Sequence, residues 1–169
     1  MIFRLSSRLA TKIKVTALKS LPLDANQLAD WSGHLLTASR MQYVIVTNTA
    51  SLYSAVMDGR GIVNDGQLLD RATRCIRDVM ADEGLEFLYV KCIAPASATV
   101  RFSKALNRSV TGSMNDLIYH AKRWLTEGDL SPHDTSFRLN EIPMSALEYN
   151  SPRAVMRGLT DAGADQLDQ

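Results

Sequence analysis

The residues best suited to chemistry lie between Arg101 and His120, where a basic loop precedes an amphipathic helix. The apolar spacing predicts that this helix begins at Ser113, directly after the loop of residues 104–112. The first N–H groups of a helix have no partner within it, and they lie at the positive end of its dipole. The segment therefore predicts an anion-binding site formed by Lys104, Asn107, Arg108, Ser109, Thr111, Gly112, Ser113 and Asn115.

Two other interpretations of this segment need no ligand. Ser113 and Asp116 have the spacing of the N-cap and N3 positions of a helix, so their side chains can satisfy the free N–H groups of the first turn. Arg108 can form a buried ion pair with Asp116 or with an acid nearer the C-terminus. The loop also lacks the glycine patterns of nucleotide-binding loops, so nucleotide hydrolysis is not expected.

His120 is the secondary candidate of the segment. Its position four residues after Asp116 favours a local side-chain pair on the helix surface. The alternative is a small-molecule enzyme, in which Asn107, Arg108, Asn115 and His120 surround a cleft between the sheet and this helix. No G-x-S-x-G motif supplies a nucleophile, so the sequence favours a binding module over an enzyme. A structural interaction protein without a ligand is the third interpretation.

The sequence contains no motif typical of a metal site or a cofactor site. His34 and His133 have no acid or cysteine at the spacing of metal ligands. Cys75 and Cys92 form neither a C-x-x-C motif nor a framework of pairs, which favours a reducing, cytoplasmic setting. We therefore expect no metal site and no cofactor.

Charge is unevenly distributed along a chain whose net charge is only +1. Residues 99–125 carry five basic residues and one acid, whereas residues 126–169 carry three basic residues and eight acids. This asymmetry favours nucleic acid or a phosphorylated ligand as the partner of the basic segment. The arginines of residues 64–80 alternate with acids at four-residue spacing, so we interpret them as a solvated, ion-paired helix face.

The N-terminal segment is basic and has no acid before Asp24, which resembles a mitochondrial presequence. The preferred alternative is a short strand over residues 2–5 and a helix capped by Ser6 or Ser7, with Leu5, Leu9 and Ile13 on one face. No stretch approaches the roughly 18 apolar residues that a membrane span requires, so no membrane association is expected.

Local patterns predict strands over residues 2–5, 34–38, 42–48, 52–57 and 98–103, with the middle three as an antiparallel meander. Residues 43–46 are apolar on both faces, so their strand should be central. Helices should follow Asn64, Ser113, Ser131 and Ser151, and residues 85–93 fit either helix or strand. The expected fold is a single α+β domain over residues 1–159, in which an antiparallel sheet (the meander plus a later strand) packs against several helices as one pair of layers. Residues 160–169 are expected to form a disordered tail.

The run Asn107-Arg108-Ser109-Val110, followed by Gly112-Ser113-Met114-Asn115-Asp116, resembles the pattern of an uncharacterised bacterial family, a domain of unknown function. The resemblance extends from residues 3–5 through residues 47–52 to residues 138–144, and so covers nearly the whole chain. It implies a bacterial, single-domain, intracellular protein, and it counts against a presequence because the family pattern begins at the first residues. It implies no activity, cofactor or catalytic residue.

Overall fold

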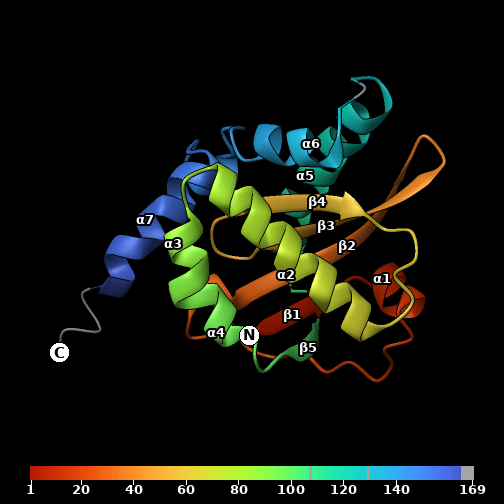
Figure 1. The fold of residues 1–169 in the computed structure, drawn as a ribbon, viewed down its shortest axis with the longest axis horizontal. Helices are drawn as coiled ribbons and strands as arrows, with labels where there is room; N and C mark the ends of the chain where they lie inside the picture. The colour runs from red at the N-terminus through yellow and green to blue at the C-terminus, as the bar shows by residue number, and fades with distance from the viewer. Residues whose placement is uncertain (107, 129, 165–169) are drawn as a thin grey trace.

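Five strands form one mixed sheet in the computed structural model, which describes residues 1–106, 108–128 and 130–164 (Figure 1). Of residues 108, 109 and 160–164 it describes only the backbone. The sheet order is β4-β3-β2-β1-β5. The strands are β1 (Ile2–Leu5), β2 (Asp30–Ala38), β3 (Met41–Asn48), β4 (Ser54–Asp58) and β5 (Arg101–Lys104). The predicted α+β class is confirmed.

The meander was predicted correctly, but the sheet as a whole is not antiparallel. Strands β2, β3 and β4 pair antiparallel, as expected from their short connections. Strand β1 instead pairs parallel with both β2 and β5. Parallel neighbours need a long connection, and here α1 (Ser7–Lys12) with the segment up to residue 29 returns the chain to the starting end of the sheet. The antiparallel prediction is therefore wrong for β1 and β5.

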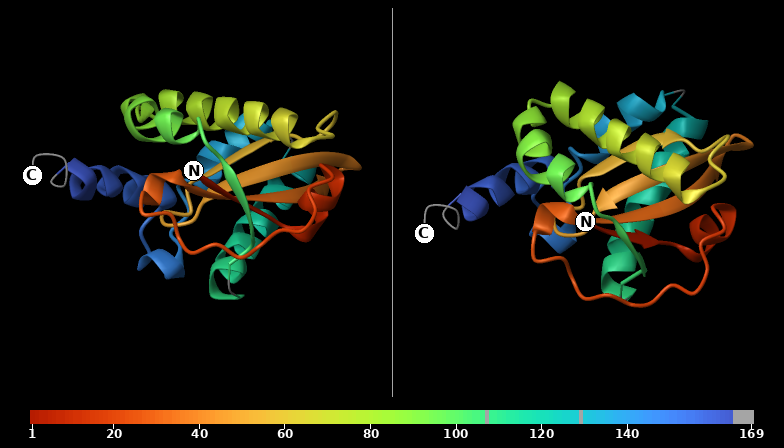
Figure 2. Two further views of the ribbon diagram at one scale, coloured as in Figure 1. Left: turned by 90° about the horizontal axis from the view of Figure 1, so that it is seen from below. Right: turned by 60° about the horizontal axis from the view of Figure 1, so that its bottom comes forward.

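Helices cover both faces of the sheet, so the expected single pair of layers is also wrong. Helix α2 (Asp65–Asp82) lies on one face and α5 (Arg108–Thr126) on the other, as the left view of Figure 2 shows. Strand β3 serves both layers: Val44 and Val46 belong to the apolar cluster of α2, whereas Tyr43 and Ile45 belong to that of α5. The prediction that this strand is apolar on both faces is confirmed, because successive side chains of a strand point to opposite sides.

Helix boundaries follow the capping signals of the sequence at most positions. Ser6 caps α1, and Asn64 caps α2 by accepting a hydrogen bond from the Gln67 N–H at 2.9 Å. Gly84 ends α2 with a φ of +73°, which glycine adopts without strain. Residues 86–96 are helical throughout, so the segment 85–93, which fitted either helix or strand, is helical from Glu86 onward. They comprise α3 (Glu86–Leu88), the π-helix η2 (Tyr89–Ile93) and α4 (Ala94–Ala96).

Serine followed by proline opens the two last α-helices as predicted. Ser131 caps α6 (Pro132–Leu139), and the Ser151 hydroxyl accepts a hydrogen bond from the Ala154 N–H at the start of α7 (Pro152–Ala164). The 3₁₀ turns η1 (Gln27–Ala29) and η3 (Ser145–Leu147) complete the elements. The disordered tail predicted over residues 160–169 is wrong for residues 160–164, because helix α7 continues through Ala164. Residues 165–169 lie outside the described residues.

Side chains of α6 occupy the outer edge of β4. The Ser54 N–H donates to Asn140 Oδ1 at 2.7 Å, and Asn140 Nδ2 donates to the Ser54 carbonyl at 3.0 Å. The Val56 N–H donates to Ser136 Oγ at 2.8 Å. These bonds replace a neighbouring strand and protect the edge from pairing with another chain. They also fix the start of the segment that leads to η3.

Candidate functional site

Helix α5 begins at Arg108, five residues before the predicted start at Ser113. Thr111, Gly112 and Ser113 therefore lie inside the helix, and the interpretation of Ser113 as its cap is wrong. Val110 and Thr111 are β-branched and Gly112 is the weakest ordinary helix former, so local propensity argued for a loop. Val110 nevertheless lies four residues before the buried Met114, so the first turn continues the apolar spacing of the helix.

The structure describes some residues of the predicted anion site and leaves others undescribed. Asn107 and the side chains of Arg108 and Ser109 lie outside the described residues, so the ion pair of Arg108 stays a prediction. Lys104 is exposed at the end of β5, and Gly112 and Asn115 are exposed on α5. Thr111 Oγ1 donates to the Leu106 carbonyl at 3.4 Å, and Ser113 is half-buried. The role of these residues in anion binding stays a prediction.

His120 packs against aromatic rings and forms no pair with Asp116. Its ring lies 5.7 Å from that of Tyr119 and 5.5 Å from that of Trp124, measured between centroids. No hydrogen bond or ion pair joins it to Asp116 in the part of the chain that the structure describes, so the expected local pair is wrong. Asn115 does not line the hollow that His120 borders.

Four exposed cations gather at the end of the sheet where β1 and β5 finish, and we call them the basic edge. Arg8 follows β1 in α1, Lys14 follows α1, Lys19 lies in the next segment, and Lys104 ends β5. The Lys104 N–H donates to the Lys19 carbonyl at 3.0 Å, which joins the two basic segments. Figure 2 (right) shows the segment after α1 running past β5 and the start of α5.

The basic edge has no acidic counterpart nearby in the sequence. Residues 1–23 and 87–115 contain no aspartate or glutamate. Among the described residues, no ion pair involves any of the four side chains. By contrast, the arginines of α2 are ion-paired as predicted, with Arg74 bound to Asp70 at 3.1 Å. The basic edge is therefore a set of exposed, uncompensated positive charges.

A buried ion pair holds the segment that carries Lys19. The Arg4 guanidinium, 1% exposed, binds the Asp30 carboxylate through Nε at 2.8 Å and Nη2 at 2.7 Å. It also donates to the carbonyls of Leu21 and Pro22, at 3.0 and 2.9 Å, and to Ser103 Oγ at 3.2 Å. The guanidinium thus ties β1, β2, β5 and the crossing segment together. Residue patterns gave no sign of this pair, because it depends on the parallel pairing of β1 with β2.

Hydrogen bonds to the Asp30 carboxylate decide its protonation. Burial alone would raise the pKa of Asp30, but hydrogen bonds from Arg4, Thr49 and the Asp24 N–H outweigh it and hold the pKa below its usual range.

Burial lowers the pKa of His34, which lies on the face of the sheet covered by α5. Burial also raises the pKa of Cys75 to about 12, so this thiol is a poor nucleophile.

A second buried carboxylate lies at the end of α2. Glu83, 7% exposed, accepts a hydrogen bond from the Tyr53 hydroxyl at 2.6 Å through Oε2. Its Oε1 is buried and has no hydrogen-bond partner in the described structure. Burial is the largest influence and raises the pKa of Glu83, although Tyr53, Arg153 and Arg157 oppose it.

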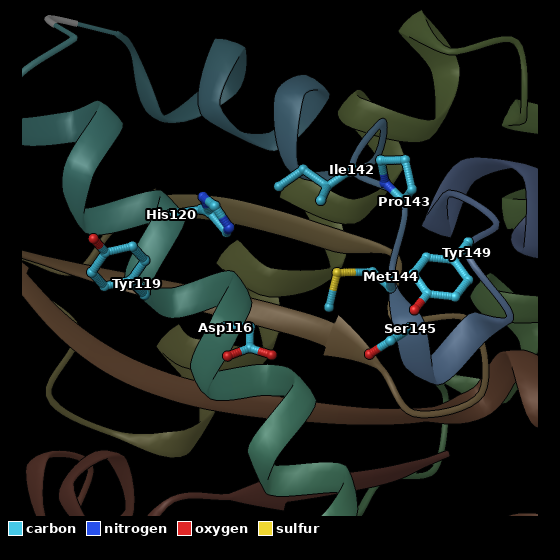
Figure 3. Close-up of a pocket in the computed structure, with 8 residues that line it drawn as sticks. All are labelled: Asp116, Tyr119, His120, Ile142, Pro143, Met144, Ser145 and Tyr149. Atoms are coloured by element: carbon cyan, nitrogen blue, oxygen red, sulfur yellow. The ribbon is translucent and has the colours of Figure 1, made fainter.

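The hollow beside His120 has a volume of about 260 Å³ and separates α5 from the segment of η3 (Figure 3). Its lining residues are Asp116, Tyr119, His120, Ile142, Pro143, Met144, Ser145 and Tyr149. We call it the Asp116 groove. It lies on the same helix as the predicted anion site, but its lining carries a carboxylate and no lysine or arginine.

The family model described as "Domain of unknown function (DUF6933)" matches residues 2–155. The chain belongs to this family. The search of curated proteins and the search of solved structures gave no match. The DUF6933 match confirms the resemblance to an uncharacterised family seen in the sequence, and it assigns no activity to the basic edge or to the groove.

Within the described ranges, no three His, Cys, Asp or Glu side chains are grouped so that they could hold a metal ion. None of the helices described is long and apolar enough to cross a membrane.

Proposed function

We propose that the domain binds nucleic acid through the basic edge. The observation that carries this proposal is the hydrogen bond between the Lys104 N–H and the Lys19 carbonyl, which places two acid-free basic segments side by side. Exposed cations without ion-pair partners are available to phosphates, and their contacts release counterions from the nucleic acid. Helix α5 begins at Arg108, four residues after the end of β5 at Lys104, so the positive end of its dipole adds to the charge of that lysine.

The arrangement of the cations favours a polymer over a small phosphorylated ligand. A hollow of about 330 Å³ opens beside Arg8 and is lined also by Ser7, Thr11 and Leu35. Only one cation of the basic edge borders this hollow, so a small anion in it would meet a single positive charge. An extended polyanion can contact all four cations, which lie in α1, in the segment that follows α1 and at the end of β5.

Salt-dependent binding of labelled oligonucleotides tests the proposal. Fluorescence anisotropy with single-stranded and duplex probes should show affinity that falls steeply as salt rises. The double variant Lys19→Gln/Lys104→Gln removes two phosphate contacts. It should reduce the slope of log K against log salt by about 1.4 for single strands or about 1.8 for duplex.

The matched control is Lys91→Gln/Lys122→Gln, which changes the net charge equally at two exposed lysines outside the basic edge. This control should keep the slope of the unmodified protein. Equal losses in both double variants would show only a general effect of net charge and would overturn the proposal. Absence of binding at low salt would do the same, as would binding of inorganic phosphate without affinity for either oligonucleotide.

A further inference from the structure

The Asp116 groove lies between two anchored elements. On one side, α5 is fixed to the sheet by Leu117, Ala121 and Leu125, which belong to one apolar cluster with strand residues of β2, β3 and β4. On the other side, Met144 forms the floor and is itself 6% exposed within the apolar cluster of α5. The groove is therefore present in the folded domain before any ligand arrives.

Hydrogen bonds fix the segment that forms the second wall. The Met144 N–H donates to the Asn150 carbonyl at 3.1 Å, and the Tyr149 N–H donates to the Met144 carbonyl at 2.9 Å. The Arg153 N–H donates to the carbonyl of Asn140, whose side chain is bound to the edge of β4. The loop is thus closed on itself and tied to the sheet.

The wall of the groove contains strained backbone. Glu148 and Tyr149 both adopt the left-handed region, with φ of 54° and 64°. A bulky residue rarely adopts this conformation, which costs on the order of 1 kcal/mol or more. Burial does not compensate for it at Tyr149, because this side chain is 76% exposed. The hydrogen bonds of the loop maintain this conformation and place the Tyr149 ring at the rim of the groove, across from Asp116 in Figure 3.

The polar groups of the groove favour a positively charged ligand. Asp116 is exposed, and no hydrogen bond or ion pair to its carboxylate occurs among the residues that the structure describes. The lining includes no lysine or arginine, and the rings of Tyr119 and Tyr149 offer π-faces at its rim. A carboxylate next to aromatic rings is suited to a cation that forms hydrogen bonds and also stacks.

The size of the groove limits the ligand to one side chain. Its volume of about 260 Å³ is below the range of roughly 300–1,000 Å³ typical of sites for small molecules. Exposed tyrosines such as Tyr119 and Tyr149, at 65% and 76%, are typical of protein interfaces. A planar guanidinium can bind Asp116 through two parallel hydrogen bonds while it stacks on a tyrosine ring, which an ammonium group cannot do.

We propose that the Asp116 groove binds an arginine side chain of a partner protein. This site is independent of the nucleic-acid proposal, because the two share no residue and differ in the charge of the ligand. The groove supplies one anchor point, and the exposed tyrosines at its rim would contact the residues that flank the arginine.

Titration with blocked tripeptides tests the site directly. Acetyl-Gly-Arg-Gly-amide should cause saturable changes in the amide NMR signals of Asp116, His120, Ser145 and Tyr149, at millimolar concentrations suited to one side chain. The lysine peptide should bind several-fold more weakly, and the glutamine peptide should cause no saturable change. Asp116→Asn should reduce affinity for the arginine peptide at least tenfold, because the amide keeps the shape and removes the charge. Tyr149→Ala should reduce it by a smaller factor.

Glu86→Gln is the matched control, since it neutralises an exposed carboxylate of α3 that does not line the groove. It should leave the titration unchanged, and circular dichroism should show that every variant is folded. Equal binding of the arginine and glutamine peptides would overturn the proposal. An unchanged affinity of Asp116→Asn, or tighter binding of lysine than of arginine, would also overturn it.

Discussion

Two buried carboxylates of this domain have opposite environments. Asp30 and Glu83 are 2% and 7% exposed, so both have lost most of their hydration. Asp30 accepts hydrogen bonds from two guanidinium nitrogens of Arg4, the Thr49 hydroxyl and the Asp24 N–H. Glu83 accepts one, from Tyr53, and its second oxygen has no partner in the described structure. Similar burial therefore coexists with very different hydrogen bonding.

The difference shows that the donors around a buried acid, more than its burial, decide how it titrates. Asp30 has a lowered pKa, so its contribution to stability is present above the pKa of an unfolded aspartate and is lost as pH falls through the folded value. Glu83 has a raised pKa, so its contribution is present below the pKa of an unfolded glutamate and is lost as pH rises through the folded value.

Removal of Arg4 should have the largest effect on stability. Arg4→Leu leaves the Asp30 carboxylate buried without its cation, and breaking such a pair costs about 3–5 kcal/mol. The variant also frees the carbonyls of Leu21 and Pro22, so the segment that carries Lys19 should lose protection from hydrogen exchange. Urea denaturation at pH 7 measures the free energy of unfolding.

Two further variants test whether the loss of stability comes from the Arg4–Asp30 ion pair. Arg8→Leu removes an exposed arginine of the same N-terminal segment and should leave the unfolding midpoint unchanged. Asp30→Asn combined with Arg4→Leu should be less destabilised than the sum of the two single variants, because no uncompensated charge then stays buried. Additive losses would contradict the view that the two side chains act as a pair.

Loss of the Tyr53 hydroxyl should have the second largest effect. Tyr53→Phe removes the one hydrogen bond that the Glu83 carboxylate accepts, and leaving a buried acceptor unsatisfied costs about 1–3 kcal/mol. The pKa of Glu83 should rise further, because Tyr53 opposes the effect of burial. Denaturation and NMR titration of the carboxyl carbon measure the two effects.

The control is Tyr43→Phe, since within the described residues the Tyr43 hydroxyl forms a hydrogen bond only to the weak acceptor Met41 Sδ, at 3.9 Å. It should be less destabilised than Tyr53→Phe. Equal losses would indicate that the hydroxyl of Tyr53 matters through packing and not through Glu83.

Features set by neighbouring residues were predictable from the sequence. The cap at Asn64, the stop at Gly84 and the meander of β2 to β4 depend on contacts a few residues apart, and each was found. The start of α5 was missed because Val110, Thr111 and Gly112 in its first turns have poor local helix propensity.

Features that depend on long-range pairing were not predictable. Arg4 and Asp30 are 26 residues apart, and only the parallel pairing of β1 with β2 places them in contact. The basic edge likewise combines two segments that the sequence analysis treated separately, the N-terminal cations and the loop after β5. For the groove, Asp116 and His120 were recognised, but the placement of residues 142–149 opposite them depends on the binding of α6 to the edge of β4.

Replacement of Glu83 by its amide should have the smallest effect and the clearest dependence on pH. Glu83→Gln keeps an acceptor for Tyr53, so the free energy of unfolding should change by less than about 1 kcal/mol at acidic pH. As pH rises from the pKa of an unfolded glutamate through the raised folded pKa, the unmodified protein loses stability and the variant does not. The variant should therefore gain relative stability across that window and then keep a constant advantage. Asp30 and His34 titrate in both proteins, so the difference between the two pH profiles isolates Glu83, and a difference independent of pH would show that its pKa is not raised.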